Sequence, residues 1–162
     1  MMYDAKAIEK RLGDAGITFS LLEHPPVYTC EEAEQVYGDK QSLSSKNLLL
    51  KDRKSRRFYL FVLPTSREVS LTELGDKVGE KLKFANPHDL EILLGVSPGS
   101  VSPFGLLNDY DGKVTLWLAW EVEDAAMVSF HPNDNARTLE MTQEAFQAFL
   151  ALLSHQVIRE RS

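Results

Sequence analysis

Two apolar runs separated by a short polar segment are the feature that most constrains how this chain folds. The runs are residues 46–51 (KNLLLK) and 58–63 (FYLFVL), and the polar segment between them is DRKSRR. Short apolar runs bounded by turn-forming residues are typical of β-strands, and a connection this short favours antiparallel pairing. We therefore predict a β-hairpin in the first half of the chain.

Capping patterns predict helices on both sides of this hairpin. A capping side chain accepts a hydrogen bond from the first helical turn, and a glycine often follows the last turn. By these criteria, helices begin after Asp4, Thr29, Ser70, Asn86 and Thr142, and the first four end near Gly16, Gly38, Gly79 and Gly95. Further extended segments are predicted at 18–23, 81–85, 114–120 and 126–130, and an irregular loop at 96–104.

Helices and strands are interspersed along the 162 residues, with no repeat, linker or low-complexity tract. A chain of this length can bury a full apolar core as one domain. We predict a single domain over residues 1–162 of the mixed α/β class. Its sheet should be mostly antiparallel, approach a barrel and be flanked by helices.

Several functional classes are excluded by what the sequence lacks. A single cysteine, Cys30, rules out a disulfide framework and a thiolate zinc site. There is no GxSxG, P-loop or GxGxxG motif, and the four histidines lack metal-ligand spacing. No stretch reaches the ~18 apolar residues that a membrane span needs. We expect a cytoplasmic protein without a metal, cofactor or membrane partner.

Basic residues are concentrated in and around the predicted hairpin. Residues 46–57 hold six lysines and arginines against one acid, although the whole chain carries a net charge of -6. Lys77, Lys81 and Lys83 extend this patch along the sequence. Such a segment is either a solvated hairpin tip or a local phosphate-binding patch. Wholesale coating of nucleic acid is excluded by the acidic remainder.

Three segments have residue types suited to binding or catalysis, and each also has a purely structural explanation. Lys46 and Asn47 open an apolar strand, where they are either a solvated strand end or a fixed cation and amide for a polar substrate. Residues 95–105 (GVSPGSVSPFG) are either an ordinary loop or a cradle of backbone N–H groups. His131, followed by Pro132, is either a hydrogen-bonded turn histidine or an acid–base or ligand-binding group on a rigid element.

Taken together, these segments resemble the YbaK-like aminoacyl-tRNA deacylases, and most of all the free-standing prolyl-tRNA editing proteins. The resemblance runs over nearly the whole chain, from the first predicted helix to the last. Its motifs occur in the family's order and spacing: HPPV at 24–27, KNLLL at 46–50, GVSPGSV at 95–101, PFGLLN at 103–108 and FHP at 130–132.

The resemblance implies an α/β editing domain that hydrolyses the ester of a tRNA carrying the wrong amino acid. The usual substrate in this branch is alanyl-tRNA(Pro), and a sister branch removes cysteine from tRNA(Pro). No metal and no covalent nucleophile are implied. The expected partners are the aminoacylated tRNA and, transiently, prolyl-tRNA synthetase, and the expected oligomeric state is a monomer.

The family's functional residues carry over to matching positions of this sequence. Lys46, Asn47 and His131 match the catalytic positions, with Lys46 expected at the ribose-phosphate end and His131 at the aminoacyl ester. The expected substrate-binding residues are Pro26, Val27, Leu48, Gly95, Gly99, Ser100, Val101, Pro103, Phe104, Gly105 and Asn135. The expected tRNA-binding residues are Lys51, Arg53, Lys54 and Lys81.

The sequence departs from the family pattern after His131. Asn133 stands where close relatives carry an apolar residue, and Ala136-Arg137 interrupts a Thr-rich run. One wall of the aminoacyl pocket therefore differs. Two alternatives stay open at this point: a deacylase for cysteinyl- or another small aminoacyl-tRNA, and a non-catalytic module that binds an amino acid or a tRNA end.

Overall fold

The predicted hairpin is the centre of the sheet. The computed structural model describes residues 2–23, 42–134 and 136–161. In it, β2 (Leu43–Asp52) pairs antiparallel with β3 (Phe58–Pro64), from Ser45 opposite Pro64 to Lys51 opposite Phe58. The pairing is regular over all these residues, so side chains alternate between the two faces of β2 without interruption.

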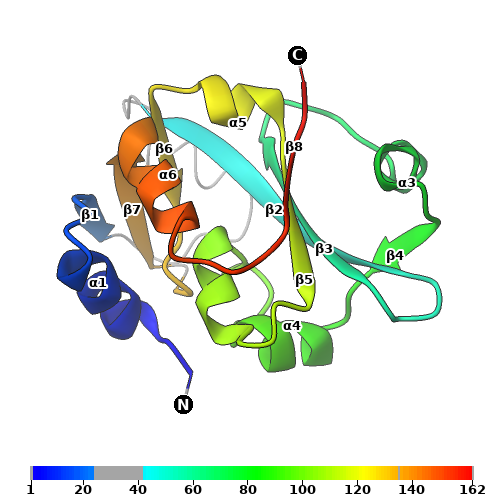
Figure 1. The fold of residues 1–162 in the computed structure, drawn as a ribbon, viewed down its shortest axis with the longest axis horizontal. Coiled ribbons are helices and arrows are strands. Elements are labelled where there is room, and N and C mark those ends of the chain that lie inside the picture. The colour runs from blue at the N-terminus through cyan, green and yellow to red at the C-terminus, as the bar shows by residue number, and fades with distance from the viewer. Residues whose placement is uncertain (1, 24–41, 135, 162) are drawn as a thin grey trace.

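One end of β2 and its partner β3 build one half of the sheet. β4 pairs antiparallel with the last residues of β2, β5 pairs parallel with β3, and β8 pairs parallel with β5. The bounds of these three strands are Leu82–Phe84, Val114–Leu118 and Val157–Arg159. In Figure 1, β3 and β5 run side by side through the middle of the molecule, and α3 lies above β4 at the right of the view.

The first residues of β2 build the other half. There Leu43 and Ser44 pair parallel with Val128 and Ser129 of β6, β6 pairs antiparallel with β7, and β7 with β1. The bounds of these strands are Met127–Phe130, Arg137–Thr142 and Ser20–Glu23. The strand order is β1-β7-β6-β2-β3-β5-β8 with β4 beside β2, which confirms the predicted mixed α/β class and mixed sheet.

The predicted helix caps are confirmed wherever the structure describes them. Asp4, Ser70 and Thr142 each accept a hydrogen bond from a backbone N–H of the first turn, and Asn86 forms a reciprocal capping box with Asp89. The helix predicted after Thr29 lies outside the described residues. The helices are α1 (Ala5–Asp14), α3 (Leu71–Val78), α4 (Pro87–Leu94), α5 (Trp120–Asp124) and α6 (Gln143–Leu150), with a 3-10 helix at Pro103–Asn108. No helix in the described ranges combines the length and apolar character that crossing a membrane requires.

The structure differs from the sequence-based elements in four places. The strand expected through Trp120 ends at Leu118, because Ala119 turns the chain into α5. The irregular loop at 96–104 leads into a 3-10 helix, which Ser102 caps by accepting from the Phe104 N–H. The two strands β7 and β8 were not predicted, because one lies between turn and cap residues and the other is three residues long.

An aromatic cluster lies where the helices meet the sheet. Phe104 and Phe149 have ring centroids 4.9 Å apart, and Phe130 and Phe146 5.1 Å apart. All four rings are at most 2% exposed, and they join the 3-10 helix and α6 to β6. α6 thereby covers the β6–β7 side of the sheet, as Figure 1 shows.

A partly buried ionic cluster fixes the C-terminal strand. The Glu160 carboxylate accepts from both terminal nitrogens of Arg67 at 2.6 and 2.8 Å and lies 3.1 Å from the Lys77 ammonium. It also accepts from the Trp120 N–H at 3.2 Å. The hydrogen bonds from Arg67, stronger than the opposing effect of burial, lower the pKa of Glu160 to about 2. β8 is therefore tied to α3 and α5 by one carboxylate.

We predict that Glu160→Gln destabilises the protein at pH 7 by roughly 1.5–3 kcal/mol, the range for hydrogen bonds to a charged group. Because the folded pKa lies below the ordinary value of 4.5, this stabilisation is present above pH 4.5 and is lost as the pH falls toward 2. The difference in unfolding free energy between variant and wild type should therefore shrink over that range in urea titrations. Glu91→Gln, at an exposed position of α4, is the matched control. A difference that stays constant down to pH 2.5 would contradict the assignment.

Candidate functional site

The pairing of β2 with β6 places Lys46 and His131 at matching positions. The last pair in this parallel ladder is Ser44 with Ser129, and Lys46 and His131 each follow it by two residues. Paired residues of neighbouring strands point to the same face, and positions two apart on one strand share a face. Two of the expected catalytic residues, 85 positions apart in the sequence, are thus on one face of the sheet at neighbouring strands.

Polar side chains of β7 continue this face. Glu140 lies opposite Ser129, and its carboxylate accepts from the Ser42 hydroxyl at 2.6 Å. Thr138 precedes Glu140 by two residues, and its hydroxyl lies 3.4 Å from His131 Nδ1. None of these four residues, Ser42, Ser129, Thr138 and Glu140, is among the site residues expected from the sequence. A spacing of two residues is the signal that could have found three of them. Ser129 precedes His131 by two residues, and Thr138 and Glu140 are two residues apart in β7, a strand that the sequence did not predict.

The orientation of His131 is set by the backbone of the same turn. His131 Nδ1 lies 2.8 Å from the carbonyl oxygen of Arg137. A carbonyl only accepts, so Nδ1 carries the hydrogen and the neutral ring has its lone pair on Nε2. Arg137 is itself held by Glu9 of α1, with 2.9 Å between the guanidinium and the carboxylate. The imidazole therefore has a defined tautomer and a supported position.

Asn47 lies on the opposite face of β2 from Lys46, because neighbouring residues of a strand alternate. Its Oδ1 is buried and has no hydrogen-bond partner in the described part of the chain, and the same holds for Ser45 Oγ two residues earlier. A buried acceptor without a partner is unfavourable by ~1–3 kcal/mol. These two side-chain oxygens, Asn47 Oδ1 and Ser45 Oγ, mark a place beside β2 where a hydrogen-bond donor from outside the described residues can bind.

Two of the expected loop glycines have a packing role. Gly95 ends α4 with φ +68°, and a Cβ there would lie 2.6 Å from Asn108 Nδ2. Asn108 Nδ2 donates to the carbonyl of Leu94 at 2.7 Å and to that of Tyr3 at 3.2 Å. A Cβ at Gly105 would lie 2.9 Å from the Leu94 Cβ. Both glycines therefore allow the 3-10 helix to approach the end of α4 closely.

The rest of this loop is partly used by its own hydrogen bonds. The N–H groups of Ser100 and Gly105 donate to the carbonyls of Ser97 and Ser102, at 3.1 and 3.0 Å. Ser100 and Pro103 are buried, Phe104 lies wholly within the aromatic cluster, and Leu48 and Val101 are half-buried at the margin of the core. Gly99 is exposed with φ +95°. Pro26, Val27 and Asn135 lie outside the described residues.

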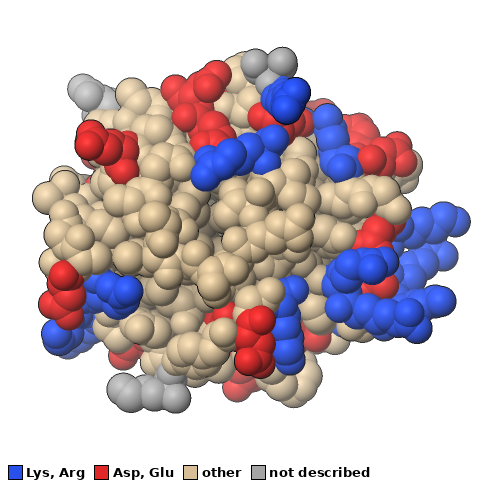
Figure 2. Space-filling model, viewed as in Figure 1, with Lys and Arg blue, Asp and Glu red and all other residues tan. Residues whose placement is uncertain are grey.

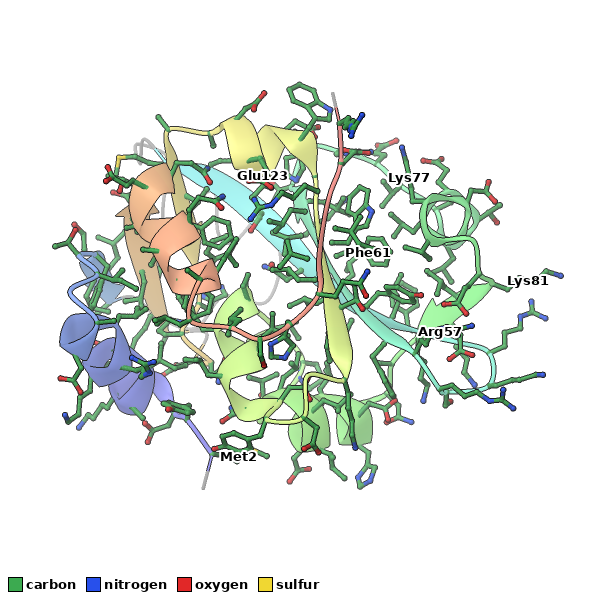
Figure 3. All side chains as sticks on the ribbon, viewed as in Figure 1. Met2, Arg57, Phe61, Lys77, Lys81 and Glu123 are labelled. Atoms are coloured by element: carbon green, nitrogen blue, oxygen red, sulfur yellow. The ribbon has the colours of Figure 1, made fainter. Side chains whose placement is uncertain are left out.

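Of the four lysines and arginines expected to bind tRNA, Lys51 differs from the other three. Its ammonium lies 2.6 Å from the Asp89 carboxylate of α4, and the residue is only 8% exposed, so Lys51 is a structural cation in this fold. Arg53, Lys54 and Lys81 are exposed. Figure 2 shows basic side chains gathered at the end of the molecule that holds the β2–β3 turn. In Figure 3, Lys81 projects outward on the same side as Arg57.

Comparison with known proteins identifies the family. The family described as the aminoacyl-tRNA editing domain matches residues 24–149, which include Lys46, the 95–105 loop and His131. The chain belongs to the aminoacyl-tRNA editing domain family. This confirms the resemblance inferred from the sequence motifs, and an aminoacyl-tRNA is therefore the class of molecule on which the family acts.

Individual relatives of this editing domain cover nearly its whole length. The prolyl-tRNA editing protein ProX of Acetoanaerobium sticklandii is 38% identical over 146 residues, which are 89% of each chain. The prolyl-tRNA synthetase associated domain-containing protein 1 of Mus musculus is 33% identical over 155 residues, covering 93% of this chain and 92% of its own. The solved structure of a candidate trans-editing enzyme for prolyl-tRNA synthetase superimposes with a TM-score of 0.73 at 21% identity, covering 100% and 99% of the two chains, and shows the same fold.

The editing domain presents no metal-binding group of three or more His, Cys, Asp or Glu side chains within the described ranges. Cys30 lies outside those ranges. The lack of a metal and of a covalent nucleophile therefore stays a prediction from the sequence.

We predict that Gly95→Ala destabilises the protein by about 2–4 kcal/mol, because the methyl group adds a collision with Asn108 to the strain of a left-handed backbone. Gly79→Ala is the matched control: Gly79 ends α3 with φ +76° and has open space around its Cβ position. It should lose only about 1 kcal/mol. Urea unfolding of the two variants measures the difference, and equal losses would show that Asn108 moves aside without cost.

Proposed function

We propose that this protein is a trans-editing deacylase that hydrolyses the aminoacyl ester of mischarged tRNA(Pro), with alanyl-tRNA(Pro) as its main substrate. Family membership and the similarity to ProX support the deacylase class. The observation that supports the proposal at individual residues is the β2–β6 register, because Lys46 and His131 each stand two residues after its last pair, Ser44 with Ser129. A cation on one strand and an imidazole just after the neighbouring strand can bind the two ends of an aminoacyl-adenosine.

The chemistry needs a water molecule, a polarised ester carbonyl and a ribose oxygen as leaving group. An ester is already activated, so positioning and oxyanion stabilisation can supply much of the rate enhancement. In this proposal Lys46 binds the phosphate or ribose of the terminal nucleotide. His131 lies at the aminoacyl ester in this proposal, with its ring oriented by the hydrogen bond between Nδ1 and the Arg137 carbonyl. The vicinal hydroxyl of the ribose assists proton transfer.

The 95–105 loop supplies the oxyanion donors in this mechanism. The N–H groups of Ser100, Phe104 and Gly105 are used within the loop. Those of Gly99 and Val101 have no partner among the described residues and are the ones we assign to the ester carbonyl. The Asn47 amide, buried on the other face of β2, is then a positioning group rather than one that contacts the same end of the substrate.

Selectivity for alanine follows from pocket size. A synthetase selecting proline cannot fully exclude the smaller alanine, because one methylene is worth only ~1–3 kcal/mol. A second site too small for proline removes the alanyl product and spares the correct one. In this proposal the site is bounded by Leu48 and Val101, which are half-buried at the margin of the core. Asn133, whose side chain donates to the carbonyl of Tyr3 at 3.2 Å, stiffens the turn after His131.

The test is deacylation of tRNA(Pro) charged separately with alanine, cysteine, serine and proline, with alanyl-tRNA(Ala) alongside. We expect selective loss of alanine from tRNA(Pro). Removal of cysteine or serine instead would keep the enzyme class and reassign the pocket. Protein that is folded and hydrolyses none of these esters would be a binding module, and the proposed function would be wrong.

We further predict that Lys46→Ala lowers kcat/KM for the preferred substrate about 100-fold or more, because the terminal nucleotide loses its positioning cation. Lys46 is half-buried within β2 and has no ion pair among the described residues, so the urea midpoint should change little. Lys6→Ala, an exposed position on α1, controls for the loss of one positive charge. Undiminished hydrolysis by folded Lys46→Ala protein would remove Lys46 from the mechanism.

A further inference from the structure

Phe84, the last residue of β4, is a large apolar side chain without a place in the core. It is 59% exposed, whereas Leu82, two residues earlier on the same face of the strand, is 8% exposed. Phe84 is also not among the partly buried residues that pack against the core. An aromatic ring left in solvent at a strand end is available to a binding partner.

Exposed cations lie on the segments that adjoin this strand. Lys81 precedes β4, Lys83 is its middle residue, and Arg53, Lys54 and Arg56 lie on the β2–β3 turn; all five are exposed. None of the five forms an ion pair within the described part of the chain, while the nearby Arg57 and Lys51 are engaged with Glu80 and Asp89. The charge of this surface, visible in Figure 2, is complementary to a polyanion rather than to an apolar protein face.

The register connects Phe84 with the candidate site. Phe84 lies directly opposite Leu50 of β2, and partners in an antiparallel pair point to the same face. Leu50 shares its face of β2 with Leu48 and Lys46, because the alternation is unbroken along this stretch. Four residues of strand separate Lys46 from Leu50, a backbone distance of about 13 Å. The ring therefore lies on the same face of the sheet as the Lys46 side chain, about 13 Å from it along β2.

We propose that Phe84 is a stacking platform for an unpaired base in the 3′ strand of the tRNA, while the cations of the adjoining segments hold its phosphates. The combination of an aromatic ring and a basic surface is how proteins bind single-stranded nucleic acid: the ring binds a base face, and the cations follow the backbone. This inference rests on the proposed tRNA substrate. It adds a contact to the unpaired strand that the cations alone do not provide.

The two parts of this surface differ in their response to salt, and that difference provides the test. Binding of uncharged tRNA(Pro) is measured by fluorescence anisotropy over a series of salt concentrations. Phe84→Ala should weaken binding about tenfold with an unchanged salt slope, because stacking involves no counterion release. Arg53→Gln should instead lower the salt slope by about one. Phe84→Trp, which keeps a stacking ring, should bind at least as well as the wild type.

A tRNA lacking its unpaired 3′ nucleotides locates the contact. On that RNA, Phe84→Ala and wild type should bind equally. Wild-type affinity of Phe84→Ala for intact tRNA, an equal loss on both RNAs, or a wild type that binds no tRNA at low salt would each overturn the proposal. A defect of Phe84→Ala confined to binding of prolyl-tRNA synthetase would also overturn it, in favour of a protein-docking site. Because the RNA is uncharged, a protein that binds it as described but hydrolyses no ester would refute the proposed function and leave the stacking platform standing.

Discussion

Strand β2 is the element on which the rest of the structure depends. Its first residues pair parallel with β6, and its remaining residues pair antiparallel with β3 and β4. One ten-residue strand therefore belongs to both halves of the sheet. Strand pairing fixes which side chains share a face. Through β2, the position of His131 after β6 is therefore fixed relative to Lys46, and that of Lys46 relative to Phe84 of β4.

Local sequence signals were sufficient for the elements that local interactions stabilise. The hairpin follows from two apolar runs and a polar turn, and the helix starts follow from short side chains that satisfy backbone N–H groups, as Asn86 and Asp89 show. The short strand β8 had no such signal, because its three residues are held by Glu160 and by pairing with β5. Elements stabilised mainly by distant parts of the chain are the ones that the sequence did not reveal.

The same division applies to the site. Lys46 and His131 were selected through motifs, but their common face depends on a parallel pairing between segments far apart in the sequence, which no periodicity encodes. The pairing of Lys51 with Asp89 likewise depends on where α4 packs, so charge alone could not separate this structural cation from the exposed ones. Thr138 and Glu140 have the spacing of a strand face but were hidden within a segment that lacked a strand signal.

The unbroken alternation of β2 also limits how the chain can change in length. Inserting one residue between Ser44 and Lys46 would turn the ammonium toward the face now occupied by Asn47 and bring the amide to the histidine's side. Inserting two would restore the face but displace the lysine by about 6.6 Å along the strand. Substitutions in this segment change one group at a time, whereas any insertion or deletion changes the whole arrangement. The spacing from the β6 ladder to Lys46 is therefore a stricter requirement than the identity of the residues that fill it.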